Sequence, residues 1–525
     1  METKNHQLAL TSLPLPRQVF SLILEANQGH LSWSNLALGI TAIVAFVVHS
    51  YNMFGYPLYY SDEGIYMEQA YAVAKLGRLA IYTYFYDHAP VAWLQLAAWS
   101  TLTGGFHAFG TPIDSGRVFI LLLHVATVIL LFRITLQLTA NTFVAIITAM
   151  LFTLSPLSVH FGRQVLLDNI MGFWVVLAMA LLLNYNGNIL RLLFSGFCFG
   201  IAVLSKENAI LLLPGFIYGL WMTVKKDHAR FARTAWLFGA IATISSYFLF
   251  AILKSELLPS SDRVSLIGAI VWQSSRKGGL PWEQTSDFYK MLINEWCGRD
   301  IWLVLLGAIA SLWNLLNRDS TRRFLGLLLL LMVLSIARGG QVYNFYVAAM
   351  LPLLAINAGI AINDCASRMK TPAMLPISLA IVATVSLTNL EGQQFLFNLD
   401  ATKMQRQVVA WVEENLPADS FILIEDNLWL DLQLSDRGEP AFANAHSHWK
   451  AARDPAVYHE MLHDNWRNID YLIVDTLMPG QFAKERDKLP YNAYINSTAI
   501  ARFEVNTFWA IESLEIRRVN DVSAM

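Results

Sequence analysis

Long apolar segments, separated by short polar loops, constrain this chain more than any other feature of its sequence. A helix that crosses a lipid bilayer needs about 20 mostly apolar residues. Only 14% of the residues are charged, against about 25% in an ordinary soluble domain. The chain is therefore predicted to be a polytopic α-helical membrane protein with about eleven spans. They lie at residues 33–53, 116–136, 141–160, 168–185, 190–205, 208–224, 234–254, 301–317, 323–338, 344–362 and 372–390.

Composition narrows the class of protein further. The net charge is −2, so no basic field points to nucleic acid as a partner. The three cysteines, Cys198, Cys297 and Cys365, have neither metal-ligand nor redox spacing. Residues 1–32 carry no compact apolar core followed by a small-residue cleavage site, so we expect the first span to stay in the protein as an anchor.

Basic residues in short loops predict the orientation, because such loops favour the cytoplasmic side. The densest clusters are KKDHARFAR (225–233), RDSTRR (318–323) and SRMK (367–370). They lie on one side if the N-terminal segment 1–32 is cytoplasmic. An odd number of spans then places residues 391–525 outside the cytoplasm, on the outer side of the cell membrane. The transmembrane domain is predicted to cover residues 33–390.

The first outer loop, residues 54–115, is long and rich in aromatic residues. Two segments in it, 64–77 and 89–105, have helical spacing and end in glycine. We predict that both helices lie on the outer membrane surface. If 89–105 crossed the membrane instead, the orientation of every later span would be reversed.

Residues 391–525 are predicted to form a small α/β domain. The segment 401–417 has the pattern of an amphipathic helix. FILIED (421–426) and YLIVD (471–475) are typical of buried strands, and AIARFEVN with FWAIESLEIRR predicts a late hairpin.

An acid pair, Asp62 and Glu63 in YSDEGIYM, follows the first apolar segment. Acids near a helix N-terminus are stabilised by its free amides and dipole, so a capping role explains the pair. Acids at the membrane edge are functional candidates when they face protein. Spacing alone does not decide between the two interpretations.

An ordered series of segments over residues 33–365 resembles the C-type integral-membrane glycosyltransferases. The similarity is strongest to the protein O-mannosyltransferases and the aminoarabinose–lipid A transferases. The series comprises YSDEGIYMEQAYAVAKLG, YDHAPVAWLQLAAWSTLTGG, DSGRVFILLLHVATVILLFR, GRQVLLDNIMGFW, LSKENAILLLPGF and RGGQVYNFYVAAMLPLLA. The resemblance implies transfer of a sugar from a polyprenyl-phosphate carrier to a lipid, glycan or protein acceptor at the outer membrane face.

The resemblance also implies roles for particular residues. Asp62 corresponds to the catalytic base, with Glu63 and Asp168 as positioning acids of the catalytic set. His88, Lys206 and Arg338 correspond to the groups that hold the donor phosphate, although the family often has Lys where His88 stands. Residues implied for the donor and acceptor pocket are Tyr60, Tyr343 and Tyr346. Arg117, at the head of the next span, is expected to be structural.

Simpler interpretations exist for several of these residues. Asp168 is explained as a helix cap, His88 as a partner of Asp87, and Tyr343 with Tyr346 as part of an aromatic belt. Lys206 with Glu207 is explained as an interfacial anchor.

Two other functions compete with this assignment. A lipid or sugar transporter would carry acids within its spans, often with inverted repeats. A metal-dependent oligosaccharyl or polymerising transferase would use paired acids to hold a divalent metal, so a metal cofactor stays open.

The sequence also contains an H-E-x-x-H match at His459, Glu460 and His463. On a helix this spacing places two histidines on one face, as in zinc proteases. No third ligand follows at a protease spacing, so a surface helix before the strand YLIVD is the favoured interpretation.

Overall fold

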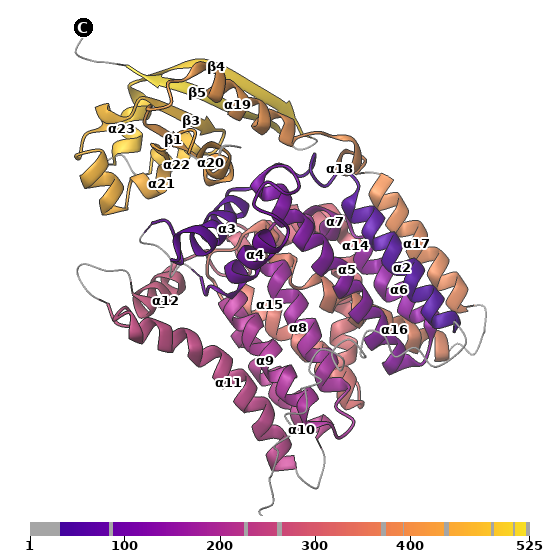
Figure 1. Cartoon of the computed structure of the whole chain (residues 1–525). Coiled ribbons are helices and arrows are strands. Elements are labelled where there is room, and N and C mark those ends of the chain that lie inside the picture. Colours follow the sequence, from indigo (N-terminus) through magenta and orange to yellow (C-terminus); the bar gives the residue numbers. More distant parts are fainter. Residues whose placement is uncertain are drawn as a thin grey trace, which may run out of the picture.

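The computed structural model describes residues 32–82, 88–224, 229–259, 265–368, 374–391, 393–434, 440–484, 488–507 and 510–520. It consists of a large helical bundle with a smaller sheet-containing domain above one end (Figure 1). The predicted segment 1–32 falls almost wholly outside the described residues, as do Asp87, Lys225, Lys226 and Lys370.

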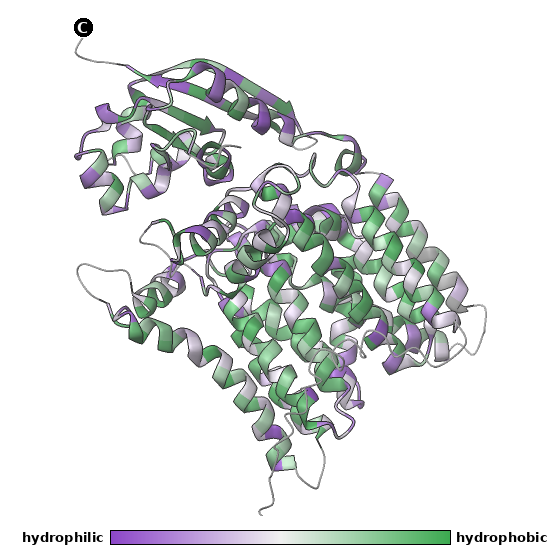
Figure 2. Cartoon of the chain, viewed as in Figure 1, coloured by the Kyte–Doolittle hydropathy of each residue, from purple (hydrophilic) through white to green (hydrophobic). Residues whose placement is uncertain are grey.

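Most of the bundle is apolar along its length (Figure 2). Five helices, two of them composite, are long and apolar enough to cross a membrane. They are α2 (Trp33–Ser50), α5 (Pro112–Thr139), α11 (Ala229–Leu253), the run Asp287–Leu315 and the run Asn344–Arg368. The first run comprises α13 (Asp287–Lys290), η4 (Met291–Trp296) and α14 (Cys297–Leu315), and the second contains η5 (Asn344–Val347) and α16 (Leu351–Arg368).

Further helices, most of them shorter, complete the bundle. They are α6 (Thr142–Thr153), α7 (Pro156–Phe161), α8 (Leu167–Leu183), α9 (Ile189–Ser205), η3 (Glu207–Leu212), α10 (Leu213–Thr223), α12 (Leu266–Ser275), α15 (Ser320–Ile336) and α17 (Met374–Glu391). Every predicted span is thus helical over most of its length. The number of spans stays a prediction, because several of these helices are shorter than a bilayer crossing.

Helices α9 and α11 pack with their backbones in close contact. A Cβ atom added at Gly196 would lie 2.1 Å from the carbonyl oxygen of Trp236. Small residues permit this approach between membrane helices. Helix α9 ends directly before Lys206.

Two short helices lie at the end of the bundle nearest the smaller domain (Figure 1). They are α3 (Ser61–Tyr71), continued by η1 (Ala72–Leu76), and α4 (Val91–Leu102). With 12 residues, α4 is too short to cross a bilayer. Its length therefore agrees with a helix on the membrane surface rather than a span.

The C-terminal part has one five-stranded sheet in the order β2-β1-β3-β5-β4. The strands are β1 (Ile422–Ile424), β2 (Ala445–Ser447), β3 (Tyr471–Asp475), β4 (Ser497–Asn506) and β5 (Ile511–Val519). Strand β1 is parallel to β2 and β3, and β5 is antiparallel to β3 and β4. Both predicted buried strands and the late hairpin are present. Strand β2 was not predicted, because its three residues, Ala-His-Ser, show no apolar run.

Helices flank this sheet. They are α18 (Phe395–Asn398), α19 (Thr402–Asn415), α20 (Asp426–Gln433), α21 (His448–Ala451), η6 (Ala456–Met461), η7 (Trp466–Asn468), α22 (Met478–Phe482) and α23 (Leu489–Ile495). The predicted amphipathic helix 401–417 corresponds to α19.

The sheet-containing domain is docked directly on α3. A Cβ atom at Gly64 would lie 2.2 Å from the carbonyl oxygen of Asp426, so the helix and the domain touch through their backbones. Lys450 Nζ lies 2.6 Å from the Glu68 carboxylate of α3, and both side chains are buried. The domain therefore covers the helix that carries the acid pair.

Candidate active site

The two members of the acid pair have different surroundings because α3 begins between the bundle and the domain. Tyr60 is the N-cap, and its backbone N–H donates to Glu63 Oε2 at 3.0 Å. Successive residues of a helix point about 100° apart, so the neighbouring side chains diverge. Glu63 is fully buried, whereas Asp62 is half-buried and faces a cavity.

Glu63 is held in place by Arg117 on α5. The guanidinium donates to both carboxylate oxygens, at 2.8 and 2.9 Å, and neither side chain is exposed. The backbone N–H of Val165 donates to the same carboxylate at 2.9 Å. Glu63 lines neither cavity of the site. It fixes α3 against the bundle, and Arg117 has the structural place expected for it.

Asp62 lies at a cavity of about 190 Å³. The hydroxyl of Tyr66, one turn along α3, donates to Asp62 Oδ2 at 3.2 Å. Burial raises the pKa of the Asp62 carboxyl, while Lys206, His88 and the Tyr66 hydrogen bond act in the opposite direction. A carboxylate with a raised pKa in a cavity has the properties of a general base.

Lys206 brings a buried cation to this cavity. Its Nζ lies 2.6 Å from Asp168 Oδ2 and 4.1 Å from the centre of the Tyr346 ring. Burial acts to lower the pKa of Lys206, but the Asp168 carboxylate outweighs it and the pKa is raised. The ammonium therefore stays charged. Asp168, which lies in the first turn of α8, holds the ammonium in position.

His88 is tied to the start of η3. Its Nδ1 lies 3.0 Å from Glu207 Oε2, and the Ala89 backbone N–H donates to the same carboxylate. Tyr247 of α11 donates to the backbone carbonyl of His88 at 3.4 Å. Glu207 thus holds the loop at His88 in place through these two contacts. The pairing of His88 with Asp87 is not addressed, because Asp87 lies outside the described residues.

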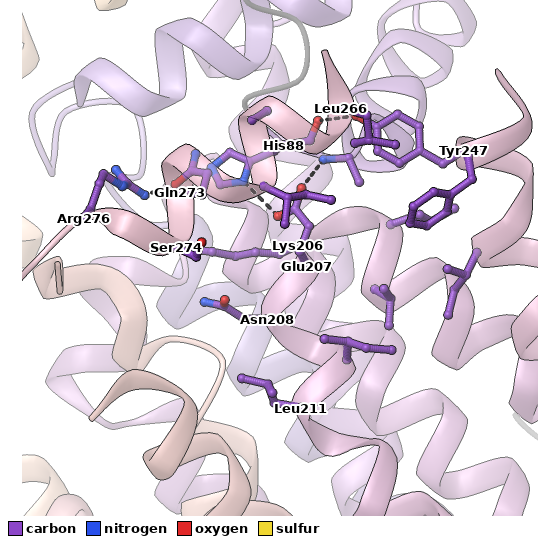
Figure 3. Close-up of a pocket in the computed structure, with 18 of the residues that line it drawn as sticks. His88, Lys206, Glu207, Asn208, Leu211, Tyr247, Leu266, Gln273, Ser274 and Arg276 are labelled. Carbon is purple, nitrogen blue, oxygen red and sulfur yellow. Dashed lines mark hydrogen bonds and ion pairs between the residues drawn. The ribbon is translucent and has the colours of Figure 1, made fainter. Parts of the chain in front are cut away.

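A second, larger cavity of about 440 Å³ adjoins the first. Figure 3 shows residues that line this larger cavity. Its walls are mostly apolar side chains of α9, η3, α11 and α12. The two cavities share five lining residues, most of them polar or charged. They are His88, Lys206, Gln273, Arg276 and Tyr346. An apolar cavity and an acid-bearing cavity therefore meet at a wall that carries cations.

Arg276 is a site residue that sequence reasoning missed. It follows α12, stacks over Trp272 at 5.0 Å and bonds to Gln273. The signal in the sequence is Arg-Lys after a short apolar helix of an outer loop. That pattern is also typical of an ordinary interfacial anchor, so it does not single out Arg276.

The remaining predicted site residues are divided between the two cavities. Arg338 is exposed and lines only the larger, apolar cavity. Tyr343 lines the smaller cavity, and Tyr346 lines both. Tyr60 lines neither; its ring packs against Phe345 at 5.7 Å, so it supports the cavity from behind.

The H-E-x-x-H segment does not form a histidine pair on one helix. Its helix, η6, ends at Met461, and His463 has a left-handed backbone with φ 50°. His459 Nδ1 instead lies 2.7 Å from Asp464. Among the described residues, no group of three or more His, Cys, Asp or Glu could hold a metal ion.

Part of the chain is similar to a known protein family. Residues 41–255 match the family model described as dolichyl-phosphate-mannose-protein mannosyltransferase. No curated protein matches the chain.

Solved structures share its fold, among them the two that follow. ArnT from Cupriavidus metallidurans, bound to undecaprenyl phosphate, is 12% identical with a TM-score of 0.55, and the alignment covers 93% of this chain and 98% of that one. The oligosaccharyltransferase AglB from Archaeoglobus fulgidus, in complex with an inhibitory peptide and a dolichol-phosphate, is 11% identical with a TM-score of 0.55. That alignment covers 91% of this chain and 74% of AglB.

Proposed function

We propose that this chain, which has the fold of the C-type integral-membrane glycosyltransferases, transfers one sugar from a polyprenyl-phosphate carrier to an acceptor. The acceptor is a lipid, a glycan or a protein, and the reaction takes place at the outer face of the cytoplasmic membrane. The match to a mannosyltransferase family model and the fold shared with ArnT support this class of reaction.

One observation carries the proposal: an apolar cavity and an acid-bearing cavity share a wall with Lys206 and Arg276. A polyprenyl-phosphate sugar has three parts, an isoprenoid chain, a phosphodiester and a sugar. The apolar cavity suits the chain, the cations suit the phosphate, and the cavity at Asp62 suits the sugar and the acceptor.

The reaction proceeds as an inverting displacement. Asp62 removes the proton from an acceptor hydroxyl or amine as its oxygen or nitrogen attacks the anomeric carbon. The bond between that carbon and the phosphate oxygen breaks, and polyprenyl phosphate leaves with the electron pair. A second carboxylic acid is not required, because phosphate is a good leaving group.

The surrounding residues divide the remaining tasks. Lys206, Arg276 and Arg338 hold the phosphate oxygens by charge-assisted contacts, and His88 supports them. Asp168 positions Lys206, and Glu63 positions α3. Tyr343 and Tyr346 shape the pocket around the sugar, with Tyr60 packed behind them.

The orientation is part of the proposal. In Figure 1 the end of α10 and the start of α11 lie at the opposite end of the bundle from the sheet-containing domain. Arg230 and Arg233 of the predicted cytoplasmic cluster belong to the first turns of α11, at that end. With about eleven spans, the C-terminal domain then lies outside the cytoplasm, together with Asp62.

A binding measurement tests the donor part of the proposal. Arg276→Ala combined with Arg338→Ala should weaken binding of undecaprenyl phosphate in nanodiscs at least tenfold, since each charge-assisted contact contributes about 1.5–3 kcal/mol. Lys290→Ala removes an exposed cation that lines neither cavity and serves as control. Equal affinity of the double variant and the wild type would place the phosphate elsewhere.

Two alternatives have separate tests. A transporter would accumulate a substrate without transferring a sugar. The acids of a transporter lie mid-span, whereas the acids of this site lie at helix ends, at the starts of α3 and α8.

A metal-dependent transferase would lose activity in a chelator and regain it with a divalent metal. The proposed displacement continues in the chelator.

A further inference from the structure

The sheet-containing domain has a cavity of its own, of about 300 Å³. Its lining comes from the segments that follow β2 and β3, together with the start of α23. In open α/β sheets, ligands bind at the carboxyl ends of parallel strands. The cavity therefore has the usual position of a ligand site in such a sheet.

The described lining of the cavity is basic. Arg453, Lys484 and Lys488 line it, and no carboxylate does so among the residues that the structure describes. His448 lies at its wall, with Nε2 3.2 Å from Gln481 Oε1 and Nδ1 3.6 Å from Glu425. Three cations around one cavity favour an anionic ligand.

Aromatic rings form the rest of the wall. Trp449, Phe482 and Tyr491 line the cavity. The flat C–H face of a sugar ring packs well on an aromatic ring, and the ring's polar edge remains free for hydrogen bonds. Cations and aromatic rings together suit a charged sugar better than a peptide, whose backbone would need a strand edge or a row of amide partners.

Three consecutive residues connect this cavity to the candidate active site. His448 lines the basic cavity, and Trp449 lines both it and the cavity at Asp62. Lys450 bonds to Glu68 on α3, the helix that carries Asp62. Trp449 is itself fixed, because its indole N–H donates to Asp426 at 2.8 Å. The indole ring of Trp449 thus lies between the basic cavity and the cavity that Asp62 lines.

We propose that the basic cavity binds the anionic part of the acceptor, a saccharide that bears a phosphate or a carboxylate. The inference rests on the proposed function, because it assigns the acceptor for the same reaction. The charged sugar would be held in the domain while its neighbouring hydroxyl or amine reaches past Trp449 to Asp62.

Saturation-transfer difference NMR tests the proposal with the full-length protein in nanodiscs of zwitterionic lipid. The probes are glucose 6-phosphate, glucuronate, glucose and an acidic tripeptide. Both anionic sugars should bind, and Lys484→Ala with Lys488→Ala should weaken them about tenfold. The matched control, Lys403→Ala with Arg467→Ala, removes two exposed cations of the same domain outside the cavity and should bind as wild type does.

The outcomes separate this proposal from the donor site. Arg276→Ala with Arg338→Ala should leave both anionic sugars bound. Tighter binding of glucose 6-phosphate assigns a phosphorylated acceptor, and tighter binding of glucuronate assigns a uronic acid. The proposal is overturned if glucose binds as well as the charged sugars, if only the tripeptide binds, or if the active-site variant rather than the domain variant loses binding. Because the assay involves no transfer, its failure leaves the glycosyltransferase proposal untouched.

Discussion

At the scale of single residues, Asp62 and Glu63 show how two adjacent acids acquire different tasks. Glu63 turns inward to Arg117 and the Val165 amide, which satisfy its carboxylate. Asp62 accepts a hydrogen bond from the Tyr66 hydroxyl and lines a cavity. Glu63 thus takes part in the cap of α3, and a catalytic role for Asp62 is our proposal.

The raised pKa of Asp62 predicts how activity depends on pH. A base acts as its carboxylate, so kcat/KM for the acceptor should fall as pH drops through the folded pKa, above the ordinary Asp value of about 3.9. Replacing the Lys206–Asp168 pair by Met and Asn removes the cation that opposes the shift. The acidic limb should then move to higher pH. A limb at the ordinary carboxyl value, or one that the paired substitution leaves in place, would contradict this assignment.

The sequence predicted the individual residues of the site better than it predicted which of these residues contact one another. The order of motifs pointed to Asp62, Asp168 and Lys206, and all three carry charges that interact at one place. The Lys206–Asp168 contact joins residues 38 positions apart, so no local pattern reveals it. Arg276 was missed for the same reason: its place at the cavity depends on how α12 folds back beside α9 and α11.

At the scale of elements, α3 joins the membrane bundle to the C-terminal domain. Glu68 of α3 and Asp426 of α20 both bond to Lys450, at 2.6 and 3.2 Å, and all three side chains are buried. Burial raises the pKa of Glu68 to about 8, with Lys450 as the main opposing influence. The ammonium is therefore required to hold two acids in one buried contact.

Removal of that ammonium should loosen the domain. Lys450→Met leaves two buried acids without their cation, which typically costs about 3–5 kcal/mol. The midpoint of thermal unfolding should fall by several degrees, and proteolysis near residue 392 should accelerate. Arg502→Met removes a cation from a largely exposed cluster and should change the midpoint little.

A double variant at Lys450 and Glu68 tests the same buried contact. Glu68→Leu combined with Lys450→Met removes one of the two buried acids together with the cation, and should recover part of the lost stability. Equal midpoints for Lys450→Met and the wild type would show that other contacts hold the domain on α3.

At the scale of the whole molecule, the candidate active site lies at one end of an apolar bundle. The elements predicted from apolar length and periodicity are present, because these patterns depend on local sequence. Strand β2 and helix α12 were not predicted, because one is too short and the other lies in an outer loop where no span was expected. The number of spans and the orientation depend on the membrane and stay predictions.

Labelling with a membrane-impermeant thiol reagent tests the orientation. In a variant without Cys198, Cys297 and Cys365, Lys403→Cys should react from outside intact cells, and Arg230→Cys should react only after the membrane is opened. Both positions are exposed in the folded chain. Reversed labelling of the two would place Asp62 in the cytoplasm and remove the basis for an outer-face reaction.

The central claim is that Asp62 is the base that joins a membrane-bound donor to a polar acceptor. The most direct measurement is the rate of sugar transfer by folded Asp62→Asn protein, with Asp168→Asn as comparison. Asparagine keeps the size and the hydrogen bond to Tyr66 but cannot accept the proton. We predict a kcat lower by about 10²–10⁴ with donor binding retained. A rate near wild type, with only the loss of about 1 kcal/mol in stability expected of a helix cap, would contradict it.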